Sequence, residues 1–254
     1  MKNNNLKQKI KNNELVLGTF MKSNDPCMAE VLGTTGLDFF VLDNEHVSIN
    51  QENISNIIRA AQLYNIAPVI RVTCNEQSKI LQVLDAGAYG VQVPNIDTFE
   101  QAKYLQDCTR YYPLGKRGFS PNVRAAEYGD IALKEYITMA NEKTVVVAHC
   151  ETVESAKNID QILLVEGIDV IFIGPMDLSQ SFGKVGDMKN PELINCIEEV
   201  TIKTLAAGKA VGTVCSLENI GKYVSMGMKY MLIGNDQGTV KNYFTKIVNE
   251  IKSI

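Results

Sequence analysis

The sequence has few of the features that mark membrane, exported or nucleic-acid-binding proteins. No apolar run approaches the roughly 20 residues that cross a bilayer. The polar start, MKNNNLKQKIKNN, lacks the apolar core of a signal peptide. The formal net charge of −4 provides no basic excess for a polyanion. We therefore expect a cytoplasmic protein with no membrane or nucleic-acid partner, although one or two arginines or lysines would suffice to hold a small anion.

The six cysteines form no C-x-x-C pair, the spacing typical of many zinc and redox sites. They are scattered through 254 residues, and in a chain of this length without an export signal they indicate reduced thiols. Several fall in apolar runs, where cysteine packs as a small apolar residue. The cysteine pattern therefore predicts neither a disulfide framework nor a thiolate metal site.

Short apolar runs alternate with amphipathic stretches along the whole chain. Such runs are typical of strands buried on both faces of a parallel sheet, and the alternation implies right-handed crossovers. Eight runs without a linker favour one α/β domain over residues 1–254, a (β/α)₈ TIM barrel, with an open doubly wound sheet as the alternative. The predicted strands are 16–20, 39–43, 68–72, 90–94, 145–150, 170–174, 210–214 and 230–234, and the predicted helices are 50–64, 76–86, 98–108, 153–165 and 191–207.

Two segments depart from this alternation. The connection from Pro94 to Val145 is long, with a second predicted helix near 130–141, and a long excursion after a barrel strand is typical of an active-site loop or lid. The last segment, from residue 238, predicts a closing helix that packs on its own barrel or on a neighbouring subunit. Its apolar face comprises Val240, Tyr243, Phe244, Ile247, Val248 and Ile251.

Charged and polar residues gather at the carboxyl ends of the predicted strands, where barrels place their catalytic groups. Both histidines of the chain are among them. Side chains alternate along a strand, so His149 and Glu151 point to the same side, although periodicity does not tell whether that side is the barrel lumen. The residues are Asp43, Glu45 and His46 after the second strand, Arg71 in the third, His149 and Glu151 at the fifth, and Gly174 and Asp177 after the sixth.

Each of these residues also has a purely structural explanation. Asp43, Glu151 and Asp177 could cap the helices that follow them, as acidic residues often do. His46 could be an ordinary loop histidine. Arg71 lies beside apolar residues and therefore needs an anionic partner, which a salt bridge to Asp43 or Asp85 would supply.

Glu151 and Asp177 follow adjacent predicted strands. Few nitrogen or sulfur side chains accompany these two carboxylates as candidate metal ligands. Two carboxylates suit a hard divalent ion such as Mg²⁺ or Mn²⁺. An octahedral ion with two protein ligands keeps positions open for a 2-oxo acid, which binds through one carboxylate oxygen and its ketone oxygen. The ion then acts as a Lewis acid on the ketone and stabilises the enolate. The pattern therefore predicts metal-dependent chemistry on a pyruvate-type enolate.

At these residues the sequence resembles the HpcH/HpaI aldolase family, the class II pyruvate aldolases. Two motifs, D-x-E-H at 43–46 and I-G-P-x-D-L-S at 173–179, are specific in combination. The resemblance implies a (β/α)₈ barrel, often hexameric, that exchanges its last helix between subunits. It also implies an aldol or retro-aldol reaction between a 2-oxo acid and an aldehyde, on 4-hydroxy-2-oxo acids. The matching stretches, in the family's order, are GTF, GLDFFVLDNEH, PVIRV, LDAGAYGVQVPN, GKRGFS, CET, VEGIDVIFIGPMDLS and GMKYMLIGND.

The resemblance also assigns roles to individual residues. Glu151 and Asp177 match the metal ligands, for Mg²⁺ or Mn²⁺ with Co²⁺ as a further choice. His46 matches the catalytic base, and Asp85 matches the acid that raises its basicity. Arg71 matches the residue that stabilises the enolate, where fixed positive charge is useful.

A second group of matches concerns the substrate. Met176 and Asp177 match positions that bind the pyruvate carboxylate through their backbone, and Gly174 belongs to the same substrate-binding turn. Asp43 is expected to contact the site residues rather than the substrate or the metal ion.

His149 departs from the family pattern, which usually has Gln at this position in contact with substrate. A histidine that faced the ion would make the ligand set one nitrogen and two oxygens and would favour Mn²⁺, Co²⁺ or Zn²⁺. We favour contact with substrate. On that interpretation His149→Gln should change substrate preference and leave metal affinity within a few-fold.

Other functions are weaker matches to the sequence. A Schiff-base aldolase needs a lysine inside a strand, and no predicted strand contains one. A citrate- or citramalate-type lyase or synthase would use an acyl-CoA partner, for which no binding signature stands out. The LIGNDQG turn could cradle phosphate, but no lysine-bearing loop supports it. An inactive binding homologue would be expected to have lost part of the set His46, Arg71, Asp85, Glu151 and Asp177.

Overall fold

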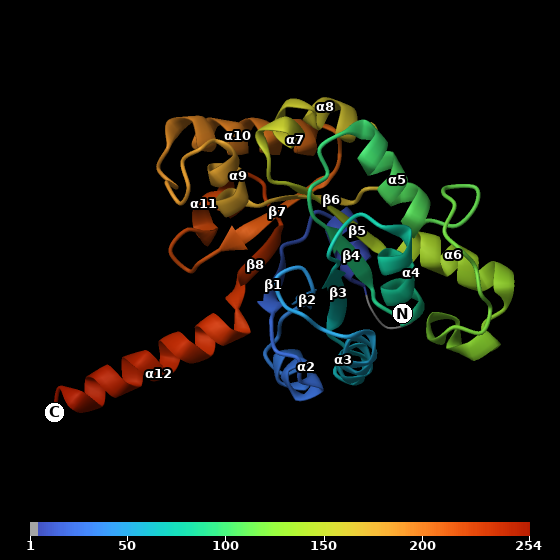
Figure 1. The fold of residues 1–254 in the computed structure, drawn as a ribbon, viewed down its shortest axis with the longest axis horizontal. Coiled ribbons are helices and arrows are strands. Elements are labelled where there is room, and N and C mark those ends of the chain that lie inside the picture. The colour runs from blue at the N-terminus through green and yellow to red at the C-terminus, as the bar shows by residue number, and fades with distance from the viewer. Residues whose placement is uncertain (1–4) are drawn as a thin grey trace.

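Eight parallel strands form a closed barrel in which each strand pairs with its neighbours in chain order and β8 pairs with β1 (Figure 1). The computed structural model describes residues 5–254. The predicted (β/α)₈ TIM barrel is confirmed, and the open sheet is not formed. The strands are β1 (Val16–Met21), β2 (Phe39–Asp43), β3 (Ala67–Arg71), β4 (Gly90–Val93), β5 (Val145–Cys150), β6 (Val170–Ile173), β7 (Ala210–Cys215) and β8 (Tyr230–Asn235).

Helices surround the barrel (Figure 1). The helix predicted over 153–165 is interrupted at Asn158, and several short helices escaped prediction because they hold too few residues to show a period. The helices are α1 (Leu6–Lys11), α2 (Pro26–Gly33), α3 (Gln51–Leu63), α4 (Gln77–Asp85), α5 (Phe99–Thr109), the 3₁₀ helix η1 (Arg124–Gly129), α6 (Leu133–Lys143), α7 (Val153–Lys157), α8 (Ile159–Ile162), α9 (Pro175–Ser181), α10 (Pro191–Ala206), α11 (Ile220–Ser225) and α12 (Asp236–Lys252).

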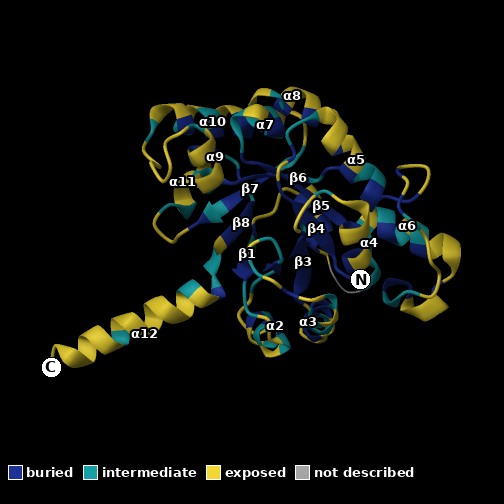
Figure 2. Ribbon diagram, in the orientation of Figure 1, coloured by how far each residue is buried: buried dark blue, intermediate teal, exposed yellow. Residues whose placement is uncertain are grey.

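Most strand residues are buried, on both faces of the sheet, as their continuous apolar runs predict, and the end of β8 is more open (Figure 2). Along β5, Val145 and Val147 pack in the barrel lumen, whereas Val146 and Ala148 pack in the layer between the barrel and its helices. The two-residue period of the strand therefore places His149 on the lumen side and carries Glu151 to the lumen's upper edge.

Helix α1 closes the amino-terminal end of the barrel. Its Leu6 and Ile10 pack with the lumen residues. Between them, the buried Lys7 donates from Nζ to the carbonyl of Thr144 at 2.8 Å and pairs with Asp169 at 2.9 Å. Arg110 pairs with the same carboxylate at 3.0 Å. Burial lowers the pKa of Lys7 from 10.5 to about 8, although the charge of Asp169 opposes the shift.

Lys7 should make the stability of the protein depend on pH. Between pH 8 and 10.5 the folded chain releases the Lys7 proton while the unfolded chain keeps it, so stability rises with pH in this window. At about 1.4 kcal/mol for each pKa unit, wild type should gain about 2–3 kcal/mol over Lys7→Met between pH 7.5 and 10. Urea unfolding at both pH values measures the difference. Lys11→Met, on the exposed part of the same helix, should keep the wild-type dependence; parallel curves for wild type and Lys7→Met would contradict the prediction.

Helix α12 runs away from the barrel (Figures 1 and 2). It contacts β1 and β8, and most of its apolar face is exposed, including Val240, Tyr243, Phe244, Val248 and Ile251. An uncovered apolar face of this kind agrees with packing against another subunit, and the exchange of α12 between subunits stays a prediction. Over residues 5–254, every helix is too short or too polar to cross a bilayer.

Candidate active site

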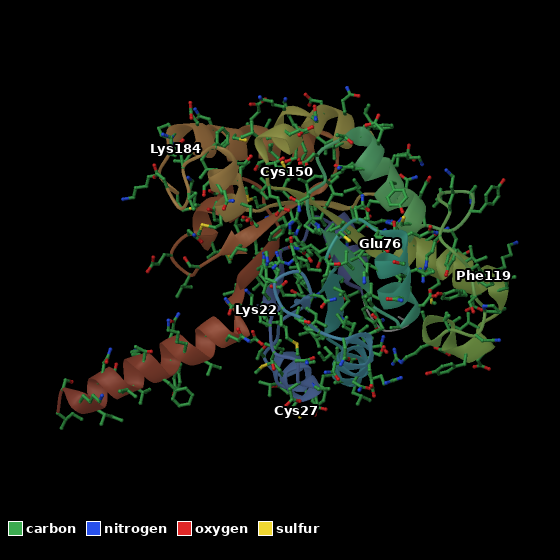
Figure 3. All side chains as sticks on the ribbon, viewed as in Figure 1. Lys22, Cys27, Glu76, Phe119, Cys150 and Lys184 are labelled. Carbon is green, nitrogen blue, oxygen red and sulfur yellow. The ribbon has the colours of Figure 1, made fainter. Side chains whose placement is uncertain are left out.

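The predicted site residues lie at the carboxyl ends of neighbouring strands. Cys150, the last residue of β5, and Lys22, which follows β1, are labelled in Figure 3 and mark this end. A pocket of about 250 Å³ opens here, and three carboxylates line it, those of Glu45, Glu151 and Asp177. Its other lining residues are Asn95, Thr152, Gln180 and Ser181.

Glu151 is buried, and both of its carboxylate oxygens accept hydrogen bonds from the protein. His149 Nδ1 lies 2.7 Å from Oε2, and the backbone N–H of Asn95 donates to Oε1 at 2.9 Å. Burial alone would raise the pKa of Glu151. The hydrogen bonds of His149 and the Asn95 amide and the charge of Arg71 outweigh burial and lower the pKa. These contacts therefore favour the ionised form of Glu151, the form that binds a metal ion.

Asp177 lies in the first turn of α9 and is exposed to the pocket. Gly174, just before the helix, separates it from Glu151. A Cβ atom on Gly174 would lie 3.0 Å from Glu151 Oε2 and 3.6 Å from Asp177 Oδ2. The two carboxylates thus border a space that the missing side chain of Gly174 leaves open, which fits a small cation.

The donor set fits a hard divalent ion with open coordination positions. Among the described residues, no three side chains of His, Cys, Asp or Glu converge to enclose an ion. Glu151 and Asp177 would supply two oxygens and leave the other positions to water and substrate.

Gly174→Ala should weaken this site without unfolding the barrel. Gly174 has φ −92°, which alanine adopts readily, so the cost arises from the new methyl group against the Glu151 carboxylate. We expect at least tenfold weaker Mn²⁺ binding, measured by isothermal titration calorimetry. Gly221→Ala is the matched control, because a Cβ there meets nothing within 4 Å. Unchanged affinity in Gly174→Ala would show that the ion binds elsewhere.

Arg71, at the end of β3, is fixed by two carboxylates from the β2 loop. Its Nη2 lies 2.7 Å from Asp43 Oδ2, its Nε donates to Asp43 Oδ1 at 3.1 Å, and its Nη1 lies 3.1 Å from Glu45 Oε2. Its guanidinium carbon also lies 4.6 Å from the centre of the Phe20 ring. The salt bridge to Asp43 considered from the sequence is present, and Glu45, the second partner of the guanidinium, lines the pocket.

Asp43 is fully buried and has two tasks. Its Oδ1 accepts hydrogen bonds from the backbone N–H groups of Glu45 at 3.2 Å and His46 at 3.1 Å, which shape the turn after β2. It also anchors Arg71. Burial would raise its pKa, but the hydrogen bond and charge of Arg71 more than compensate, and the pKa is lowered. It does not cap the next helix, since Asn50 caps α3.

The other proposed caps are also made by different residues. Thr152 caps α7, and Gly174 occupies the cap position of α9. The carboxylates of Glu151 and Asp177 are therefore not used as helix caps.

His46 stands at the rim of the site, with its side chain 55% exposed. Its ring Nε2 lies 4.0 Å from Glu45 Oε2. Burial raises the pKa of Glu45, the charge of Arg71 opposes the rise, and the charge of Glu151 adds to it. The His46 ring therefore lies beside Glu45, which lines the pocket, and is open to solvent.

The structure does not bring Asp85 to His46. Asp85 ends α4 and lies toward the amino-terminal end of the barrel, whereas His46 follows β2 at the opposite end. The Asp85 carboxylate instead accepts from Arg117 Nη2 at 2.7 Å. Within one chain the acid nearest the His46 ring is Glu45, and a role of Asp85 beside His46 stays a prediction that this arrangement does not support.

His149 is 2% exposed, and both of its ring nitrogens are engaged by protein groups. Besides the contact with Glu151, its Nε2 lies 2.7 Å from Nε2 of Gln92. Neither nitrogen faces the pocket, so the geometry runs against the substrate contact that the sequence favoured and against direct metal ligation.

Three residues of the site were not singled out from the sequence as functional. Gln92 lies in an apolar strand run, where a single amide is the only signal. Asn95 has φ +56°, a left-handed conformation that asparagine tolerates and that turns its N–H to Glu151. Glu45 was noted at a strand end but given no role, and it lines the pocket.

The chain is similar to known proteins over most of its length. The family model described as HpcH/HpaI aldolase/citrate lyase matches residues 17–242. A 2-keto-3-deoxy-L-rhamnonate aldolase of Salmonella gallinarum is 35% identical over 235 residues, which cover 92% of this chain and 87% of that protein.

Two solved structures extend the comparison. The citrate synthase SbnG is 34% identical with a TM-score of 0.90, covering 98% of this chain and 97% of that one. The citrate lyase beta subunit of M. tuberculosis, complexed with oxaloacetate and magnesium, is 13% identical with a TM-score of 0.59, covering 90% of this chain and 94% of that one, and shares the fold. The match over most of the chain, at 35% identity to a named aldolase, shows that this protein belongs to the HpcH/HpaI aldolase/citrate lyase family of lyases.

Proposed function

We propose that this protein is a divalent-metal-dependent aldolase that joins or separates the enolate of pyruvate, or of a related 2-oxo acid, and an aldehyde. The observation that carries the proposal is the pair of carboxylates, Glu151 and Asp177, bordering the open space at Gly174. Arg71 lies close enough for its charge to act on Glu151. An anchored cation beside two metal-binding carboxylates suits a reaction in which an enolate oxygen becomes negative.

Glu151 and Asp177 would hold the ion, with Mg²⁺ or Mn²⁺ preferred by the all-oxygen ligand set and Co²⁺ accepted. When bound, the ion would supply Lewis-acid polarisation of the substrate ketone. Neighbours of the same fold, including the magnesium-bound citrate lyase subunit, support a divalent ion.

The chain's own groups would perform the remaining steps. The first-turn amides of α9, at Met176 and Asp177, have no helical acceptor and would bind the substrate carboxylate at the turn made by Gly174. His46 would take the proton from the 4-hydroxyl in cleavage and return it in synthesis, at the solvent edge of the pocket. Arg71, held by Asp43, would offset the enolate charge.

Two further properties belong to this proposal. One relative is a 2-keto-3-deoxy-L-rhamnonate aldolase. This similarity favours a sugar-derived 4-hydroxy-2-oxo acid as the substrate of the present protein. The exposed apolar face of α12 favours a homo-oligomer, a hexamer by family resemblance, with α12 exchanged between subunits.

A citrate-forming reaction is the second candidate, because the citrate synthase SbnG is 34% identical over nearly the whole chain. In that reaction the carbon nucleophile would come from an acyl-CoA and the 2-oxo acid would be the acceptor. The two candidates therefore differ in which partner loses a proton.

Proton exchange separates these functions. An aldolase should exchange the methyl protons of pyruvate into D₂O with Mg²⁺, Mn²⁺ or Co²⁺ present, and EDTA should stop the exchange. Cleavage of a panel of 4-hydroxy-2-oxo acids, followed by pyruvate release, then identifies the aldehyde. Citrate formation from oxaloacetate and acetyl-CoA without pyruvate exchange would favour the second candidate, and no reaction with any metal would refute both.

A further inference from the structure

We propose that His149 is a positioning residue, the last link of a buried chain of hydrogen bonds that starts at Tyr230, passes through Gln92 and holds the Glu151 carboxylate toward Asp177. The proposal rests on the proposed function, in which Glu151 binds the metal. It assigns to His149 a task in the barrel lumen rather than in the substrate pocket.

The contacts give the chain one direction. Tyr230 donates its hydroxyl proton to Gln92 Oε1 at 3.4 Å, and Gln92 Nε2 lies 2.7 Å from His149 Nε2. An amide nitrogen can only donate, so His149 Nε2 accepts and the ring proton lies on Nδ1. That Nδ1–H points at Glu151 Oε2, 2.7 Å away. Every group in the chain thus donates to the next, and the chain ends on the carboxylate.

Burial makes this arrangement rigid. Tyr230 and Gln92 are 0% exposed and His149 is 2% exposed, so solvent offers them no competing partners. The His149 ring lies 4.9 Å from the Phe172 ring, and Tyr230 stacks on Phe39 at 4.3 Å between ring centroids. A buried amide or imidazole without its partner would be costly, so each link keeps the next in place.

The Nδ1–H of His149 determines where Glu151 points. The other protein donor to this carboxylate is the backbone N–H of Asn95, on Oε1. One bond alone would let the carboxylate turn about it, whereas two bonds on opposite oxygens fix its plane beside Gly174. Such outer partners orient metal ligands, and their loss commonly weakens metal binding 10- to 100-fold.

Two substitutions at position 149 separate the donor from the rest of the ring. His149→Asn keeps an N–H near the place of Nδ1, because the asparagine amide nitrogen lies two bonds from Cβ as Nδ1 does. His149→Leu fills a similar volume with no donor. In substrate-free protein, titrated with Mn²⁺ and followed by electron paramagnetic resonance, we expect a 10- to 100-fold larger Kd for His149→Leu and a Kd within about threefold of wild type for His149→Asn.

Further variants serve as controls for folding and for the other hydrogen bonds of the chain. Gln92→Leu/His149→Leu removes the amide that the single change leaves without a partner, so it should fold even where His149→Leu does not, and it should show the same weak Mn²⁺ binding. Tyr230→Phe removes the first link but leaves the Nδ1 donor to Glu151 in place, so it should weaken Mn²⁺ binding less than His149→Leu does. Thermal melts of the metal-free proteins report whether each variant is folded.

Glu151→Gln tests the proposed metal site separately from the positioning role of His149. If it binds Mn²⁺ like wild type, the metal site itself is misplaced and the proposed function fails. If Glu151→Gln loses Mn²⁺ while folded His149→Leu or the double variant binds normally, the metal site stands and the positioning role is refuted. If His149→Leu and His149→Asn weakened Mn²⁺ binding equally, the positioning role of His149 would also be refuted, because the Nδ1 donor would then be irrelevant.

Discussion

Glu151→Gln should lower kcat/KM for cleavage of a 4-hydroxy-2-oxo acid by at least about 1000-fold, the equivalent of about 4 kcal/mol of transition-state stabilisation. The change replaces an anionic ligand by a neutral amide at one of the two carboxylates that border the space beside Gly174. It also leaves one acceptor oxygen for two buried donors, His149 Nδ1 and the Asn95 amide. The amide therefore cannot satisfy both donors and bind an ion as well.

Steady-state kinetics over a range of Mn²⁺ concentrations measure this effect. Glu154→Gln is the matched control, because Glu154 lies three residues further along the chain, is exposed and borders no part of the pocket. It should retain wild-type kinetics. Saturation of Glu151→Gln with metal at wild-type turnover would mean that Glu151 is not a ligand, and the two-carboxylate site would have to be abandoned.

The fold could be predicted from the sequence because burial on both strand faces leaves a direct pattern. Runs such as FFVLD and VIFIG are continuous because one set of residues fills the lumen and the other contacts the helices. Short helices such as α9 and α11 are held by their neighbours rather than by a period of their own, so the sequence carried little sign of them.

From the sequence, only the site residues at the carboxyl ends of strands could be grouped together. Glu151 and Asp177 were placed together because adjacent parallel strands end at the same edge of the barrel. The contact of His149 with Gln92 joins the neighbouring strands β5 and β4, but the sequence does not tell which of their side chains enter the lumen. Tyr230 comes from β8 and meets Gln92 only across the closed barrel. Nor could the sequence show the place of Asp85, at a helix end toward the amino-terminal side of the barrel, which separates it from His46.

Arg71→Lys should lower kcat by about 100-fold and leave the affinity for Mn²⁺ nearly unchanged. Arg71 makes three polar contacts at once, two with Asp43 and one with Glu45, and presents its charge in a fixed plane. A lysine ammonium is a point charge on a flexible stem and cannot reproduce the paired contacts with Asp43. Loss of one preorganised charge beside an enolate oxygen typically costs two to three orders of magnitude in rate.

Arg71→Lys should also lower stability by about 1–3 kcal/mol, because the fully buried Asp43 loses its paired hydrogen bonds with the guanidinium and keeps the cost of its burial. Urea unfolding measures that part, and pre-steady-state cleavage with saturating Mn²⁺ measures the rate. Arg59→Lys, at an exposed position where the guanidinium donates to Asn56, should change neither quantity. If Arg71→Lys lost stability but kept wild-type kcat, Arg71 would serve only to hold the turn after β2, and the enolate would need another source of positive charge. A normal stability with a 100-fold lower kcat would instead assign the whole effect to charge placed at the reacting atoms.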